Sequence, residues 1–324
     1  MILLCGIPTE SPLEMVTNAL QELRVHHFVF NQRQVAQTQI EFAVRDGSAT
    51  GWLESGNELY RLEEFEGVYL RLMDERFLPE LMNEPENSIL RTHARTLHET
   101  LTAWLEVTNS RVVNRPSAMT SNNSKPYQAQ LIRAQGLRVP ETLITNEPEL
   151  VREFRRRHGR IIYKSISGVR SIVQMLEEKD LERLEKIRWC PTQFQEFIDG
   201  ENVRVHVVGG RVFATWIRSE AVDYRYAQSQ VGESADLEVC DLPLETAERC
   251  VALAEALELP FAGIDLKITP SRDVYCFEVN PCPGFSYYEA NTGQPIAMAV
   301  AEYLSGRPAA HEFAGAVATV PGRG

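Results

Sequence analysis

The chain has 324 residues, 44% of them hydrophobic and 24% charged, which is ordinary for a globular protein with a sizeable core. Its 33 Lys and Arg residues against 45 Asp and Glu give a net charge of −12, which argues against nucleic-acid or anionic membrane surfaces as partners, because these need a basic footprint. The sequence contains no apolar run of transmembrane length, no secretory signal and no C-x-x-C pair among its six cysteines. We therefore expect a cytoplasmic protein with reduced thiols.

The first 112 residues alternate predicted strands and helices. A strand over residues 2–5 leads into a helix whose N-terminal capping signature is Ser11, Pro12 and Glu14. The remaining elements follow in chain order: a strand at 28–30, a hairpin turn at Asp46-Gly47, a strand at 67–70 and a helix at about 86–107. We predict an N-terminal α/β domain over residues 1–112.

A polar run at residues 120–124 interrupts this periodicity and indicates a domain boundary. Elements of mixed type come next: a helix at 124–136, strands at 142–144 and 160–164 with a helix between them, and a charged helix at 177–186. They predict a central lobe over residues 113–192.

The last part of the chain is richer in strands. The predicted elements are strands at 192–198, 203–208 and 211–218 with a turn at Gly209-Gly210, a helix at 244–257, a strand pair at 261–268 and 274–280, and a helix at 295–304. They predict a C-terminal lobe over residues 193–306. The Ala/Gly-rich tail, residues 307–324, is expected to be disordered.

The strand pair near the C-terminus carries acidic side chains at matching positions. Side chains alternate along a strand, so Glu278 and Asn280 share one face, and a two-residue turn at Ser271-Arg272 would place Asp265 opposite Glu278. Two adjacent carboxylates repel each other unless a cation lies between them, and an all-oxygen set of Asp, Glu and Asn suits Mg²⁺. The alternative is a sheet with one polar, solvated face.

Two lysines occur in contexts that favour an anion. Lys164 ends an apolar strand and precedes the small-residue segment 165–171, whose backbone N–H groups could surround phosphate oxygens. Lys125 begins a helix, where a cation opposes the helix dipole. The alternative is two ordinary surface lysines. The sequence has neither a Walker-type motif nor a G-x-G-x-x-G motif.

Between these features lies a strand that bends at Asp199-Gly200. Such a bend could offer backbone groups to a heterocycle and Glu201 to a ribose diol, while Arg204 and Arg218 on neighbouring strands could bind a carboxylate or a phosphoryl group. Each arginine taken alone would more often be a surface ion-pair partner. The absence of H-E-x-x-H and G-x-S-x-G motifs argues against a zinc protease and a serine hydrolase.

In this order and spacing, over about residues 112–305, these pieces resemble the RimK-like branch of the ATP-grasp superfamily of carboxylate–amine ligases. The resemblance is carried by Lys125 before residues 136–142, Lys164 before its small-residue loop, the hinge Gln195-Glu196-Phe197-Ile198, Asn202-Val203-Arg204, Gly263-Ile264-Asp265-Leu266 and Glu278-Val279-Asn280-Pro281. Other segments look similar to microviridin-type (graspetide) peptide ligases: residues 142–146, 223–225, 241–243, Glu289 and 292–296.

The resemblance implies an α+β / α/β ATP-grasp fold, with an N-terminal α/β (pre-ATP-grasp) domain and ATP held between two α+β lobes. Carried over by position, the site residues would be Lys125 and Lys164 for the α/β-phosphates, Gln195, Glu196, Phe197 and Ile198 for adenine through the hinge backbone, Glu201 for ribose, and Asp265, Glu278 and Asn280 for one or two Mg²⁺, with Mn²⁺ as a substitute. Arg204, Arg218 and Lys164 would be catalytic.

Three positions depart from the family pattern. Asn202 stands where RimK-like chains usually have Asp, the loop after Lys164 has a single glycine, and residues 281–285 follow the RimK-like pattern more than the microviridin one. The resemblance implies an ADP-forming ligase that makes an amide or ester through an acyl-phosphate, from a peptide or amino-acid substrate. The alternatives are a small-molecule amino-acid or glutamate ligase and a non-catalytic nucleotide- or peptide-binding module; a homodimer is left open.

Overall fold

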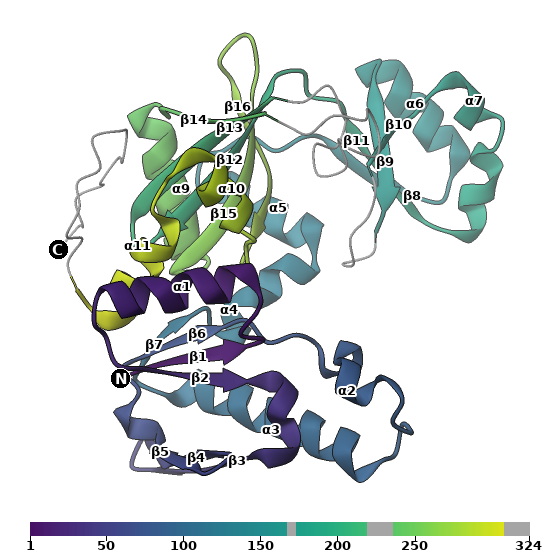
Figure 1. The fold of residues 1–324 in the computed structure, drawn as a ribbon. Coiled ribbons are helices and arrows are strands. Elements are labelled where there is room, and N and C mark those ends of the chain that lie inside the picture. The colour runs from purple at the N-terminus through teal and green to yellow at the C-terminus, as the bar shows by residue number, and fades with distance from the viewer. Residues whose placement is uncertain (167–172, 219–235, 308–324) are drawn as a thin grey trace.

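The computed structural model describes residues 1–166, 173–218 and 236–307, which form three regions (Figure 1). The purple and blue N-terminal region lies beneath the green and yellow C-terminal lobe, and the teal central lobe projects to one side. Among the described residues, no helix is long and apolar enough to cross a membrane.

The N-terminal region is built on a four-stranded parallel sheet in the order β2-β1-β6-β7. Alternate residues of β1 face opposite layers: Ile2 and Leu4 pack toward helix α1, and Leu3 and Cys5 toward helix α3. The elements are β1 (Ile2–Gly6), α1 (Ser11–Glu22), β2 (His27–Asn31), β6 (Gly67–Leu70), α2 (Pro79–Met82), α3 (Ile89–Val107) and β7 (Arg111–Val113).

An antiparallel three-stranded sheet is attached to this region. It comprises β3 (Thr38–Arg45), β4 (Ser48–Ser55) and β5 (Glu58–Arg61), and β3 and β4 meet at the predicted Asp46-Gly47 turn. The predicted cap of α1 is wrong by one residue, since Glu10 is the N-cap and its side chain makes no capping hydrogen bond. The Glu10 carboxylate instead pairs with Arg71, and the backbone N–H of Glu10 donates to the Ile7 carbonyl in the turn before the helix.

The central lobe is a small antiparallel sheet in the order β10-β9-β11-β8, with helices on one side. Its core contains Val151, Phe154, Ile161, Leu176, Leu184 and Phe194. Its elements are β8 (Thr142–Thr145), α6 (Pro148–His158), β9 (Ile161–Ser165), β10 (Gln174–Met175), α7 (Glu178–Leu181), the 3₁₀ segment η5 (Leu184–Trp189) and β11 (Thr192–Glu196). α4 (Pro116–Met119) and α5 (Lys125–Ala134) precede this lobe.

The predicted single helix at 177–186 is wrong, because the segment divides into α7 and η5. The apolar residues that pack on the lobe core are Leu181, Leu184 and Ile187, three residues apart. That spacing matches the three residues per turn of a 3₁₀-helix better than an α-helix.

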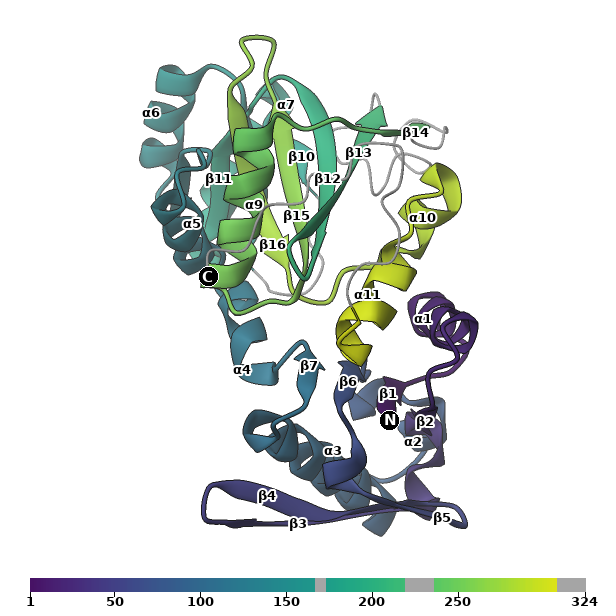
Figure 2. The ribbon, with the colours of Figure 1, turned by 90° about the vertical axis from the view of Figure 1, so that its left-hand side faces the viewer.

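The C-terminal lobe is an antiparallel sheet in the order β14-β13-β12-β15-β16. Its strands are β12 (Glu201–Val208), β13 (Arg211–Arg218), β14 (Asp236–Val239), β15 (Phe261–Ile268) and β16 (Val274–Asn280). α9 (Leu244–Ala256) covers one face, while α10 (Ser286–Thr292), which the sequence did not predict, and α11 (Ile296–Ser305) lie toward the other (Figure 2). α5 joins this lobe through Gln128, which exchanges two hydrogen bonds with the Val279 backbone.

α1 and α11, from opposite ends of the chain, pack side by side (Figures 1 and 2). Leu13, Val16 and Leu20 of α1 share one buried cluster with α11 residues that include Val300 and Leu304. The N-terminal region and the C-terminal lobe are therefore joined by a common core.

Candidate nucleotide and metal site

Asp265 of β15 and Glu278 of β16 are directly opposite each other, as the sequence predicted. The predicted two-residue turn is wrong, because Ile268 pairs with Val274 and five residues connect the strands. A β-bulge then shifts the register between Asp265 and Leu266, which restores the Asp265–Glu278 pairing. The bulge thus keeps the two carboxylates directly opposite each other on adjacent strands.

Each carboxylate has a cationic partner. Arg204 Nη1 lies 2.8 Å from Asp265 Oδ1, and Lys125 Nζ lies 3.0 Å from Glu278 Oε2. Lys125 also donates to Asn122 Oδ1 at 2.6 Å. Lys125 thus lies within this charged cluster, and its predicted contact with the α/β-phosphates remains a prediction.

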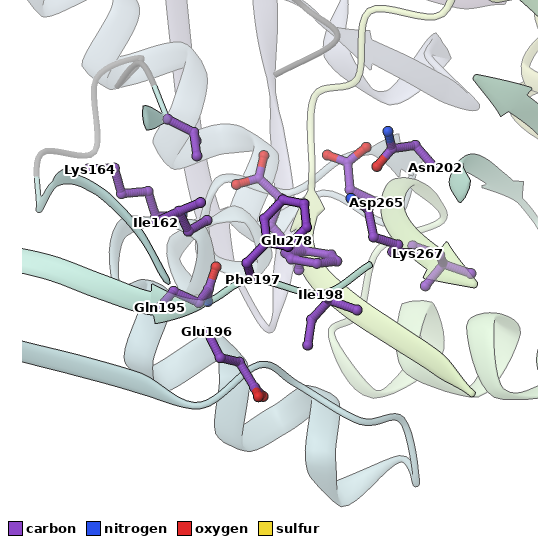
Figure 3. A pocket seen from close by; sticks show the side chains of 13 residues that line it. Ile162, Lys164, Gln195, Glu196, Phe197, Ile198, Asn202, Asp265, Lys267 and Glu278 are labelled. Carbon is purple, nitrogen blue, oxygen red and sulfur yellow. The ribbon is translucent and has the colours of Figure 1, made fainter. Parts of the chain in front are cut away.

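A pocket opens between the central lobe and the C-terminal lobe, with about 780 Å³ of space including its mouth. Lys164 lines it from β9, facing Asp265 and Glu278 (Figure 3). The lining residues come from both lobes: Ile162, Lys164, Val173, Gln195, Glu196, Phe197, Ile198, Asn202, Asp265, Leu266, Lys267, Phe277 and Glu278.

The predicted hinge, residues 195–198, forms one wall of this pocket. The Glu196 carboxylate turns away from Asp265 and Glu278 (Figure 3), accepts from the Glu141 N–H at 2.8 Å, and lies 3.5 Å from His158 Nδ1. The Glu196 side chain therefore holds the hinge to its own lobe, which leaves contact with a ligand to the backbone and to Phe197 and Ile198.

Lys267 lines the same pocket and was not predicted as a site residue. Its ammonium lies 5.3 Å from the centre of the Phe197 ring, and burial lowers its pKa, partly offset by Asp199. The signal was present in the sequence, because Lys267 follows Asp265 by two residues and so shares its face. The lysine connects β15 to the hinge across the cleft.

Five predicted site residues lie outside the lining of this pocket: Lys125 and Arg204, which pair with the lining residues Glu278 and Asp265, and Asn280, Glu201 and Arg218. Glu201 is exposed at the start of β12, and the next residue, Asn202, lines the pocket instead. Arg218 pairs with Glu238 of β14 at 2.9 Å, and because Arg204 is opposite Thr215, Arg218 belongs to the other face of the sheet. The predicted roles of Glu201 and Arg218 remain predictions. Residues 167–171 and 223–225 lie outside the described part of the chain.

The Arg204 side chain is closely packed against neighbouring residues. His206, fully buried two residues along β12, accepts a long hydrogen bond from Arg204 Nε, and the Tyr288 ring centre lies 5.8 Å from the guanidinium carbon. Burial, and then the Arg204 charge, lower the pKa of His206 well below its usual range, so the imidazole is neutral and can accept from arginine. α10 supplies Tyr288.

The donor set fits Mg²⁺. Asp265, Glu278 and Asn280 offer carboxylate and carboxamide oxygens on one face of the hairpin, the ligand type that Mg²⁺ prefers. The described residues contain no group of three or more His, Cys, Asp and Glu that could hold a metal. Mg²⁺ held by these three side chains would complete its coordination with oxygens from water and from a phosphate-bearing ligand, which is usual for this ion.

Comparison with known proteins places this geometry in a family. The model of the RimK-like ATP-grasp domain matches residues 122–304. A probable alpha-L-glutamate ligase of Aliivibrio salmonicida (strain LFI1238) is 29% identical over 209 residues, 61% of this chain and 68% of the relative. Its counterpart in Xanthomonas euvesicatoria pv. vesicatoria (strain 85-10) is 30% identical over 211 residues, 62% and 70% of the two chains.

Solved structures match nearly the whole chain. A RiPP-associated ATP-grasp ligase of Chryseobacterium gregarium, in complex with ADP and a leader and core peptide, has a TM-score of 0.79 at 22% identity and covers 99% of both chains. The ATP-grasp ligase PsnB, complexed with a phosphomimetic variant of its minimal precursor, Mg and ADP, has a TM-score of 0.75 at 26% identity, with 94% of this chain and 97% of PsnB covered.

These similarities confirm the predicted fold class, because both structures are ATP-grasp ligases and the overlap includes the N-terminal sheet as well as the two lobes. The family model itself covers more than half of the chain, from the helix that carries Lys125 to α11. The protein belongs to the RimK-like ATP-grasp family and is an ATP-grasp ligase.

Proposed function

We propose that this ligase joins a carboxylate to an amine or a hydroxyl of a peptide substrate, through an acyl-phosphate, and converts ATP to ADP and phosphate. The observation that carries the proposal is the pocket in which Lys164 faces Asp265 and Glu278, because it combines cations and carboxylates at one end with a hydrophobic hinge at the other. A triphosphate with its metal suits the charged end, and a purine suits the hinge.

The reaction would take place at the charged end of the pocket. A substrate carboxylate oxygen attacks the γ-phosphorus, the bond to the β-phosphate oxygen breaks, and ADP leaves. Lys125, Lys164 and Arg204 are the cations available to offset the charge on the transferred group, and phosphoryl transfer depends mainly on such positioning and electrostatics. Bound Mg²⁺, held by Asp265, Glu278 and Asn280, would supply further positive charge.

In the second step, the acceptor nitrogen or oxygen attacks the acyl carbon, phosphate leaves, and the acceptor loses a proton. The structural similarity supports a peptide substrate, since PsnB and the Chryseobacterium gregarium ligase are described with peptides bound and the overlap extends through the N-terminal region. The curated glutamate ligases favour a second candidate, a ligase of free glutamate, but they match only about 60% of this chain.

The test is a product analysis with two substrate sets. The protein is incubated with ATP and Mg²⁺ and either acidic peptides that contain Ser, Thr and Lys, or free glutamate with amino-acid acceptors. ADP and phosphate with a peptide that has lost water support the proposal. Glutamate addition supports the second candidate. AMP and pyrophosphate would overturn the acyl-phosphate chemistry, and nucleotide binding without turnover on either set would indicate the non-catalytic module.

A further inference from the structure

Arg71, just beyond strand β6 of the N-terminal sheet, reaches the loop that follows the metal-ligand candidate Asn280. Its guanidinium forms two hydrogen bonds with Glu10, at 2.9 Å and 2.5 Å, and donates through Nη1 to the Pro283 carbonyl at 3.2 Å. The same nitrogen lies 3.4 Å from Cys282 Sγ. Only 8% of the Arg71 side chain is exposed, so this contact between regions is buried and fixed on several sides.

The backbone around Arg71 is built for close approach. A Cβ atom at Gly6, the last residue of β1, would lie 2.8 Å from the Arg71 carbonyl oxygen, and Gly6 has a φ of +156°. The Arg71 N–H donates to the Cys5 carbonyl at 2.8 Å. The ends of β1 and β6 thus fix the Arg71 backbone, and Glu10 fixes its side chain.

The loop held by Arg71 contacts Asn280 directly. The Cys282 N–H donates to Asn280 Oδ1 at 2.9 Å. At the near end of the loop, Asn114 Nδ2 donates to the Pro281 carbonyl at 2.5 Å. Two side chains from outside the C-terminal lobe therefore hold the carbonyls of Pro281 and Pro283, and the amide between them orients the Asn280 carboxamide.

We propose that Arg71 is a positioning residue for the metal-binding end of β16. A carbonyl oxygen has two lone pairs, so the bond from the Cys282 amide fixes which end of the Asn280 carboxamide faces the loop and leaves a second lone pair for a cation. Groups that hydrogen-bond a metal ligand directly, as the Cys282 N–H does here, commonly change metal affinity 10- to 100-fold when lost, and we expect Arg71, which acts on that amide through the loop, at the low end of this range. The inference rests on the proposed role of Asn280.

An arginine is required by this geometry. One guanidinium binds both oxygens of Glu10 and still donates to the Pro283 carbonyl, whereas an ammonium cannot span two carboxylate oxygens in a planar, bidentate manner. Arg71→Lys should therefore weaken the hold on the loop, and Arg71→Met, which keeps the length of the stem, should remove it.

The test uses two readouts on the full chain. The first is the alkylation rate of Cys282, measured by peptide mapping, with exposed Cys190 in the central lobe as the internal reference. The second is the Mn²⁺ affinity of the protein with ADP, measured by electron paramagnetic resonance. The matched control is Arg33→Met, which removes a surface arginine that pairs with Glu80 in the same region.

For Arg71→Met we expect Cys282 to react several-fold more slowly than in the wild type, because loss of the nearby cation raises the pKa of its thiol and lowers the thiolate fraction. Cys190 should be unchanged, and Mn²⁺ affinity should fall about tenfold. Both readouts for Arg71→Lys should lie between those of the wild type and Arg71→Met, and both readouts for Arg33→Met should match the wild type. Folded Arg71→Met with both readouts unchanged overturns the inference; if that variant does not fold, Arg71→Lys and Glu10→Gln decide by the same readouts. A wild type that binds no Mn²⁺ with ADP would refute the proposed function instead, while Cys282 reactivity still tests the hold of Arg71 on the loop.

Discussion

Gly263 lies directly against the guanidinium of Arg204: a Cβ atom at this glycine would come within 2.4 Å of Arg204 Nη2. It would also lie 2.6 Å from Pro283 Cβ. The strand next to Arg204 therefore needs the one residue without a side chain, so that the arginine can lie flat beside Asp265.

We predict that Gly263→Ala lowers kcat by roughly a hundredfold, because the added methyl group displaces a cation that the proposed reaction needs. Overpacking should also lower the free energy of unfolding by about 1–3 kcal/mol. Steady-state ADP release and urea unfolding measure the two effects. Gly284→Ala is the matched control, since a Cβ there meets no atom within 4 Å. Equal kcat for both variants would contradict the proposal that close packing of Gly263 against Arg204 is needed for catalysis.

Glu278→Gln should abolish most turnover, with a fall of roughly a hundredfold or more, because it removes a negative charge from the metal-ligand candidates at almost constant volume. The melting temperature should change little, since Glu278 is partly exposed. Glu178→Gln, at an exposed carboxylate that pairs with Arg155, controls for loss of an ion pair. ADP release with a circular dichroism melt makes the comparison, and a fully active Glu278→Gln would refute the metal role.

Glu196→Ala should leave KM for ATP within about twofold of the wild type, because its carboxylate bonds the Glu141 N–H away from the pocket. The free energy of unfolding should fall by about 1 kcal/mol, the value of one such hydrogen bond. Initial rates over a series of ATP concentrations, with urea unfolding, test both parts. Exposed Glu185→Ala is the comparison, and a tenfold rise in KM would assign the Glu196 side chain to the nucleotide.

Lys267→Met should raise the free energy of unfolding at pH 7, because burial lowers the pKa of Lys267 and the folded protein carries the cost of a buried cation. As pH rises through the lowered pKa toward about 10.5, the folded state loses this proton before the unfolded state does, so the wild type gains stability and the difference shrinks. Urea unfolding at pH 7 and pH 10 measures this, with exposed Lys179→Met as control. A difference that grows with pH would refute it.

The sequence predicted the Asp265–Glu278 pair correctly through a turn that does not exist. Strand alternation and the chain distance between the two carboxylates suffice for the pairing, whereas the five-residue connection and the compensating bulge depend on local backbone geometry. The error in the predicted turn shifts the register by one residue, and the unpredicted bulge shifts it by one residue in the opposite direction, so the two errors cancel. Register in a hairpin depends on both its turn and its bulges, and a pattern with a period of two residues shows only their sum.

Other differences arise where contacts between regions override local signals. Ser11 is a residue type that favours the N-cap position. The helix nevertheless starts one residue earlier than predicted, with Glu10 as its N-cap, and Glu10 pairs with Arg71, which is distant in sequence. Arg204 and Arg218 were placed correctly on neighbouring strands, and only the strand register shows that their side chains belong to opposite faces of the sheet. Lys267 was overlooked because a lysine on a polar face usually faces solvent, and only the fold encloses it beside Phe197.

The shared packing of α1 and α11 has a practical consequence for dissecting the protein. A fragment trimmed to the family match at residues 122–304 would uncover the side of α11 that Leu13, Val16 and Leu20 normally shield from water. Such a strip of exposed aliphatic surface favours self-association. The catalytic half is thus dependent on the opening helix for its solubility, and minimal versions of this enzyme will need that helix or a polar substitute for it.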